Sequence, residues 1–128
     1  MTLLNNTSYE VVPDKLIIDS RHPLDVKVVS IKANQGIVKR GTVLSLTNTN
    51  EYIVFGTVLV DPQTSSKANC VVSEDVDTTS DGATVPVEVY ISGHLNKNIL
   101  IVQEGSSLKA TDIEDLRSSG IFVSSSNN

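Results

Sequence analysis

Residues 85–96 read V-P-V-E-V-Y-I-S-G-H-L-N, and this segment says more about the fold than any other part of the chain. Apolar residues recur at every second position through most of it, which is typical of a half-buried strand. We therefore predict a strand over 84–92, with Glu88 and Tyr90 on the face away from the core. Ser92 and Gly93 are expected to end it in a turn. The residues expected to face the core are Val85, Val87, Val89 and Ile91.

One short helix is predicted downstream, over residues 111–119. Thr111 is a suitable N-cap, and Glu114 three residues later would complete a capping box. Gly120 can adopt the left-handed conformation that commonly follows the last turn of a helix. The sequence G-I-F-V at 120–123 then predicts a final strand.

The earlier part of the chain predicts several short strands separated by turns rich in Asn, Asp, Ser and Gly. In the segment 26–33, Val26, Val28 and Ile31 are expected to face the core. The segments predicted as strands are 16–18, 26–33, 43–46, 52–60 and 69–73. The sequence thus predicts a mostly β protein: a small β-barrel or β-sandwich-like domain over 21–124 with one short C-terminal helix. An extended N-terminal arm (residues 1–20) precedes it, and a short tail (125–128) follows.

The composition limits the classes of function. The 128 residues carry a net charge of −5, and the Lys and Arg residues are scattered, so we expect no nucleic-acid partner. The first residues, M-T-L-L-N-N, lack the basic start and long apolar stretch of a signal peptide. No apolar run approaches the length of a membrane-spanning helix. We therefore expect synthesis in the cytoplasm and no membrane association.

The residues that could carry chemistry form no recognisable motif. Cys70 lies beside two valines and is expected to be a buried apolar residue. His22 and His94 have neither the spacing nor the partners of a metal motif, so we expect hydrogen-bonded or surface turn histidines. The acidic loop 74–82 contains Asp75 and Asp77 but not the order of a calcium loop, which favours a solvated loop over a weak cation site. No nucleophile or phosphate-binding motif is present, so we expect no enzyme, no cofactor and no metal.

One alternative comes from the sequence I-V-K-R-G-T-V-L at 37–44. It is similar to a turn in the hammerhead domains that carry lipoyl or biotinyl groups. Those domains present a modifiable lysine at a hairpin tip. The corresponding candidates here, Lys67 and Lys97, do not have the flanking residues of that motif. A hammerhead-type carrier or ligand-binding domain remains the alternative interpretation.

Taken in order, the segments of the chain resemble the head decoration proteins of tailed bacteriophages, the family that includes the capsid-stabilising protein of phage lambda. The resemblance covers roughly residues 37–123. It rests on G-T-V-L at 41–44, the acidic loop, the strand that leads into S-G and L-N at 92–96, and the helix that leads into G-I-F-V.

This resemblance implies a homotrimer on the outer surface of the virion head, made in the cytoplasm of a bacterial host. Its partner would be the major capsid protein, at three-fold and quasi-three-fold sites of the expanded shell, which it would stabilise. In that family an N-terminal arm becomes ordered on the shell. An extended arm can add a strand to a sheet edge and place alternate side chains in pockets. The arm residues expected to bind the capsid are Leu3, Leu4, Tyr9, Val11 and Val12.

Overall fold

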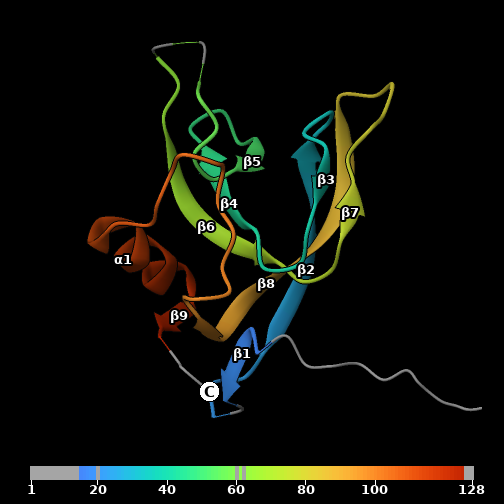
Figure 1. Ribbon diagram of the computed structural model, residues 1–128. Coiled ribbons are helices and arrows are strands. Elements are labelled where there is room, and N and C mark those ends of the chain that lie inside the picture. The colour runs from blue at the N-terminus through green and yellow to red at the C-terminus, as the bar shows by residue number, and fades with distance from the viewer. Residues whose placement is uncertain (1–14, 20, 60, 62, 126–128) are drawn as a thin grey trace, which may run out of the picture.

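The computed structural model of the protein describes residues 15–19, 21–59, 61 and 63–125 (Figure 1). Within these residues the fold is mostly β, with a five-stranded barrel and one short C-terminal helix, as the sequence predicted. The elements are β1 (Ile17–Asp19), β2 (Asp25–Lys32), β3 (Ile37–Val38), β4 (Val43–Thr47), β5 (Tyr52–Val54), β6 (Ser66–Val72), β7 (Val76–Asp77), β8 (Thr84–Asn96), α1 (Ala110–Ser119) and β9 (Ile121–Ser124).

The barrel has the strand order β8-β2-β5-β4-β6 and closes because β6 also pairs with β8. Only the β2–β5 pairing in the barrel is parallel. The last third of β8 extends beyond the barrel, where β1 pairs with it antiparallel and β9 pairs with it parallel. Helix α1 packs against β6 and β9, beside the barrel (Figure 1). The short pair β3–β7 forms a separate two-stranded sheet.

Strand β8 is longer than predicted, because Ser92-Gly93 does not end it. Gly93 has φ of +142° and lies within the strand, where a β-carbon would come 2.6 Å from Leu24 Cδ2. Glycine therefore allows a close approach of Leu24 rather than a turn. The prediction of a turn here was wrong, and the consequence is structural: β8 continues to Asn96 and joins the barrel to β1 and β9.

Two apolar cores lie on opposite faces of the sheet. The first fills the barrel with side chains from all five of its strands, including Val87 and Val89 of β8. The second lies between the barrel, α1, β9 and the segment around β1, and Tyr90 belongs to it. Tyr90 thus faces away from Val89, as predicted, but it is buried. Strands buried on both faces carry consecutive apolar residues, which explains the run Cys70-Val71-Val72 in β6.

The prediction for β2 was half right. Ile31 is fully buried, but Val26 and Val28 are exposed by 45% and 63%, and Val29 faces the core instead. The reason is the period of two: Val29 and Ile31 share one face of the strand, and Val26 and Val28 share the other. The sequence V-K-V-V-S-I offers apolar residues on both faces, so the pattern alone did not decide between them.

Helix α1 begins one residue earlier than predicted, and Thr111 is not its N-cap. The N-cap is Lys109, whose backbone N–H donates to Asp112 Oδ2 at 2.8 Å. Asp112 stands at the third helical position, where a side chain can reach back to the N-cap backbone. The C-terminal prediction is confirmed, since Gly120 adopts φ of +109° and its N–H donates to carbonyls of the last turn. Leu116 anchors the helix in the second core.

Candidate functional site

The five arm residues predicted to bind a capsid (Leu3, Leu4, Tyr9, Val11 and Val12) lie outside the described residues. The structure does describe where this part of the chain joins the barrel. Leu16 is completely buried in the second core, and its carbonyl accepts a hydrogen bond from Asn96 N–H at 2.7 Å. Ile17 then pairs with Leu95 across the β1–β8 ladder. From Leu16 onward the backbone therefore has a fixed position on β8.

Val26 and Val28 leave apolar surface on the outer face of β2. Both side chains are more than two-fifths exposed, and they lie two residues apart on the same face. Exposed neighbouring valines are costly in water unless a partner covers them. The sequence analysis had placed both valines on the core side of this strand, and the structure places them on the outer side.

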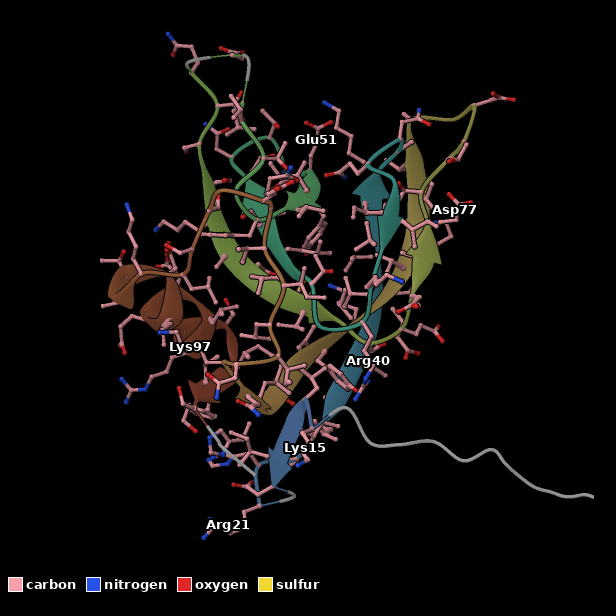
Figure 2. The ribbon with its side chains drawn as sticks, in the orientation of Figure 1. Lys15, Arg21, Arg40, Glu51, Asp77 and Lys97 are labelled. Carbon is pink, nitrogen blue, oxygen red and sulfur yellow. The ribbon has the colours of Figure 1, made fainter. Side chains whose placement is uncertain are left out.

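A cluster of titratable side chains lies where β1, the turn after it, and β8 meet; we call it the Asp19–His22–His94 cluster. His94 Nδ1 donates to Asp19 Oδ2 at 2.8 Å, and His22 Nδ1 lies 3.6 Å from Asp19 Oδ1. Arg21, labelled at this end of the molecule in Figure 2, has its Nη2 atom 3.7 Å from Asp19 Oδ2. Among the described residues, this is the one group of three or more His, Cys, Asp or Glu whose ligand atoms lie within 4.8 Å of one another.

The hydrogen bond from His94 is the largest influence on Asp19 and lowers the pKa of its carboxyl to about 2. The backbone N–H of Arg21, which donates to Asp19 Oδ1 at 3.1 Å, lowers this pKa further. Asp19 is therefore ionised throughout the neutral range. The Asp19 and His94 side chains are each only 19% exposed, so the charged carboxylate of Asp19 is largely shielded from solvent.

Few features of the sequence indicate this cluster. His94 was expected in a turn but lies within β8, opposite Asp19 in the β1–β8 register. Asp19 and His94 are 75 residues apart in the chain, so local spacing could not pair them. The signal that could have been used is the proximity of Asp19 and His22 just after a short predicted strand. Its meaning depends on which strand pairs with β1.

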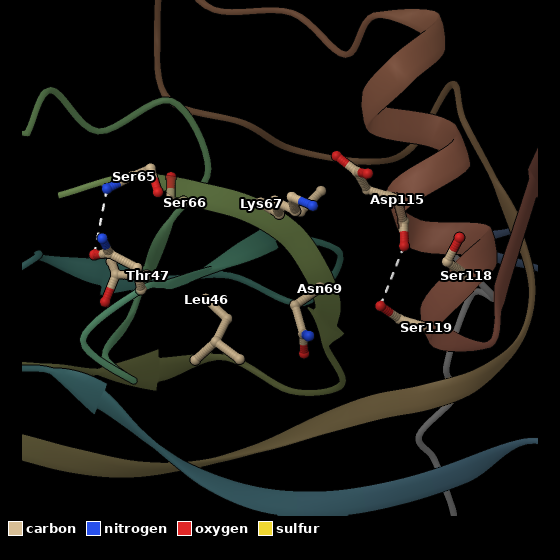
Figure 3. Close-up of a pocket in the computed structure, with 11 residues that line it drawn as sticks. Leu46, Thr47, Ser65, Ser66, Lys67, Asn69, Asp115, Ser118 and Ser119 are labelled. Carbon is tan, nitrogen blue, oxygen red and sulfur yellow. Dashed lines mark hydrogen bonds between the residues drawn. The ribbon is translucent and has the colours of Figure 1, made fainter.

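A shallow groove of about 420 Å³ separates β6 from α1 (Figure 3). Lys67 and Asp115 line it from opposite walls, together with Ser118 and Ser119. Lys67 lies inside β6 and is exposed, rather than at a hairpin tip as a hammerhead lysine would be. Lys97, the second candidate, lies in the turn directly after β8.

Asp75 and Asp77 of the acidic loop both accept hydrogen bonds from backbone N–H groups. Asp75 Oδ1 accepts the Arg40 backbone N–H at 2.8 Å, and Asp77 Oδ1 accepts the Thr79 N–H at 3.0 Å. The bond from Thr79 lowers the pKa of Asp77. Glu88 Oε1 accepts a hydrogen bond from the Ser73 hydroxyl at 2.7 Å. Each of these three carboxylates therefore accepts a hydrogen bond within the protein.

Cys70 is buried as predicted, with 1% of its surface exposed inside the barrel. Burial raises the pKa of its thiol to about 12. At neutral pH this cysteine is a protonated apolar side chain, so it offers neither a nucleophile nor a metal ligand.

No model of a known protein family matches the chain, and no curated protein matches it in sequence. Within the described residues, no helix combines the length and apolar character that crossing a membrane requires.

Proposed function

We propose that this protein is a structural virion component that binds the outside of an expanded phage head as a trimer and stabilises the shell. It would occupy three-fold and quasi-three-fold positions on the major capsid protein. Two things support the proposal: the ordered resemblance to head decoration proteins, which implies a small mostly β domain, and the mostly β fold of the structure.

The observation that carries the proposal is the way the chain enters the barrel. Leu16 is buried and hydrogen-bonded to Asn96, and β1 is paired with β8. Any segment before residue 15 therefore starts from a fixed point on the barrel surface. The sequence places apolar residues at positions 3, 4, 9, 11 and 12 of that segment, separated by polar ones. A tethered segment of this composition suits strand addition to a sheet edge on a partner.

A trimer makes such a contact effective even when each arm binds weakly. Once one arm is bound, the other two are held near their own sites, so their binding becomes intramolecular. Stabilisation of the shell then follows from linkage, because a ligand that binds only the expanded state favours that state. Expansion would create the sites, and attachment would thereby depend on maturation.

The test is light scattering of the purified protein followed by co-sedimentation with expanded and unexpanded heads of the cognate phage. We expect a trimer that sediments with expanded heads only. Deletion of residues 1–12 should leave a folded trimer that no longer sediments with them. A matched control replaces Asn5 and Asn6 with Ser, while the test variant replaces Leu3 and Leu4 with Ser. Only the leucine variant should lose binding.

Two results would contradict the proposal. One is a monomer that ignores expanded heads, and the other, for the arm mechanism alone, is full-affinity binding by the truncated protein. The hammerhead alternative predicts instead a mass increase on Lys67 or Lys97 corresponding to a lipoyl or biotinyl group. Intact-mass measurement on protein from the native host distinguishes the two functions.

A further inference from the structure

The Asp19–His22–His94 cluster has the composition of a metal site. Two imidazoles and one carboxylate are a common three-ligand set for zinc, with water in the fourth position. The ligands come from β1, the turn that follows it, and β8, so they converge through tertiary structure. Asp19 and His94 are direct cross-strand partners, which places their side chains on the same face of the sheet.

The distances fit a small ion with little adjustment. At metal–ligand bonds of about 2.0–2.1 Å, two ligand atoms of a tetrahedral site lie roughly 3.3 Å apart. His94 Nδ1 lies 2.8 Å from Asp19 Oδ2, and His22 Nδ1 lies 3.6 Å from Asp19 Oδ1. One ligand atom from each of the three residues lies within 4.8 Å of the other two. Coordination through one Asp19 oxygen therefore requires small rotations of the three side chains.

A second, independent observation is the state of His22 Nδ1. This atom is buried from solvent, and its nearest acceptor, Asp19 Oδ1 at 3.6 Å, lies just beyond hydrogen-bond distance, although the His22 side chain as a whole is 43% exposed. It lies on the side of the ring that approaches the Asp19 carboxylate. A buried imidazole nitrogen without a partner is destabilising, and coordination of a cation would satisfy it.

The surroundings hold the ligands in place, as outer partners do in established metal sites. His94 Nε2 lies 2.7 Å from Ser124 Oγ. In the ion-bound protein the proton of His94 would lie on Nε2, where it would be donated to Ser124 Oγ, and Nδ1 would offer its lone pair to the ion. The His22 ring packs on Phe122 with centroids 4.7 Å apart and meets His94 edge to face at 5.3 Å. Strand β9 thereby orients both imidazoles.

From this geometry we propose that Asp19, His22 and His94 bind one Zn²⁺ ion per chain, with solvent completing the coordination. The ion takes the place of the proton between His94 Nδ1 and Asp19 Oδ2, and the proton of the neutral imidazole moves to Nε2. Its effect is to clamp the three-residue strand β1 to β8. This inference does not depend on the proposed capsid function, since it concerns the isolated chain.

Arg21 is the neighbouring positive charge that opposes a cation. Its guanidinium is 87% exposed and only 3.7 Å from Asp19 Oδ2, so it can turn into solvent when an ion binds. The Arg21→Ala variant should therefore bind zinc more tightly than the natural sequence. A purely hydrogen-bonded Asp–His pair would give no reason for such an increase.

The test uses full-length protein freed of metal with a chelator and then titrated with Zn²⁺ by calorimetry and with Co²⁺ by visible absorption. We expect one equivalent of Zn²⁺ per chain and the intense absorption of four-coordinate Co²⁺. Asp19→Asn and His22→Gln should abolish both, and His22 is exposed enough that its variant should still fold. Asp81→Asn, an exposed carboxylate of the acidic loop, is the matched control and should bind as the natural protein does.

A structural measurement accompanies the titration. Zinc should slow amide hydrogen exchange in β1 and in its partner segment of β8, without changing exchange in the β4–β5 hairpin. The Ser124→Ala variant should bind about 10- to 100-fold more weakly, as is usual when the outer partner of a ligand is removed. The proposal is overturned if the natural protein binds no stoichiometric zinc, or if Asp19→Asn and His22→Gln bind it unchanged. In the first case the cluster is a hydrogen-bonded Asp–His pair, and in the second any bound zinc lies elsewhere on the surface.

Discussion

Replacing Gly120 with alanine should destabilise the protein more than any ordinary surface substitution. Gly120 connects α1 to β9 and has φ of +109°, a conformation that costs a residue with a β-carbon about 1–2 kcal/mol. The added β-carbon would also lie 2.7 Å from the Ile91 carbonyl oxygen. That oxygen belongs to the backbone of β8 and cannot rotate away. Overpacking of this kind typically costs another 1–3 kcal/mol.

The expected loss is therefore about 2–5 kcal/mol, the sum of these two contributions. Gly36 provides the matched control, because it also has a positive φ, of +79°, but no atom lies within 4 Å of the position of its β-carbon. Gly36→Ala should lose only the conformational part, about 1–2 kcal/mol. The difference between the two variants isolates the contact between Gly120 and β8.

Urea unfolding followed by far-ultraviolet circular dichroism measures both variants, and it needs no tryptophan. Comparison of midpoints at an unchanged m-value gives the change in the free energy of unfolding. If Gly120→Ala and Gly36→Ala lose the same stability, the helix–strand junction does not approach β8 as closely as described. The close packing of the α1–β9 junction against β8 would then be wrong.

Two further predictions concern buried groups. The Ser45 hydroxyl is buried without a partner, so Ser45→Ala should raise the free energy of unfolding by about 1 kcal/mol. Ser73→Ala removes the donor to Glu88 and should lower the free energy of unfolding by about the same amount. Urea unfolding measures both changes, and a change in the same direction for the two variants would contradict the prediction. Cys70 in the folded protein should react with iodoacetamide at pH 8 about 1,000-fold more slowly than an ordinary thiol, because a pKa of about 12 leaves so little thiolate. The rate should rise about tenfold per pH unit while the fold persists, and mass spectrometry showing rapid native-state labelling would refute the burial.

The sequence predicted the elements of this fold better than their pairing. The alternation through Val87 and Val89, the stop at Gly120 and the final strand are local patterns, and each is confirmed. The inward assignment of Val26 and Val28 failed because both faces of β2 carry apolar residues, and only the closed barrel selects one of them. The turn expected at Gly93 failed for a related reason. Gly93 leaves room for the Leu24 side chain, and the sequence alone does not distinguish such a glycine from one that forms a turn.

The sequence could not predict that His94 joins Asp19 and His22, because this depends on how β1 pairs with β8. The β1–β8 ladder is irregular: Ile17 pairs with Leu95, and a register shift between Ile17 and Asp19 brings His94, rather than Gly93, opposite Asp19. Nothing local to either residue encodes that register. It depends on Leu16 and Leu95, which are both fully buried in the second core and lie beside the pairing.

The pairing of β1 with β8 also connects the metal cluster to the N-terminal segment. A strand of three residues contributes few hydrogen bonds, so β1 is among the weaker pairings of the sheet. It is nevertheless the pairing that fixes where the N-terminal segment leaves the barrel. An ion shared by Asp19 and His94 would stabilise this pairing and so reduce local opening of β1. An arm that binds weakly benefits from a rigid attachment, because each conformation removed at its base lowers the entropy lost on binding.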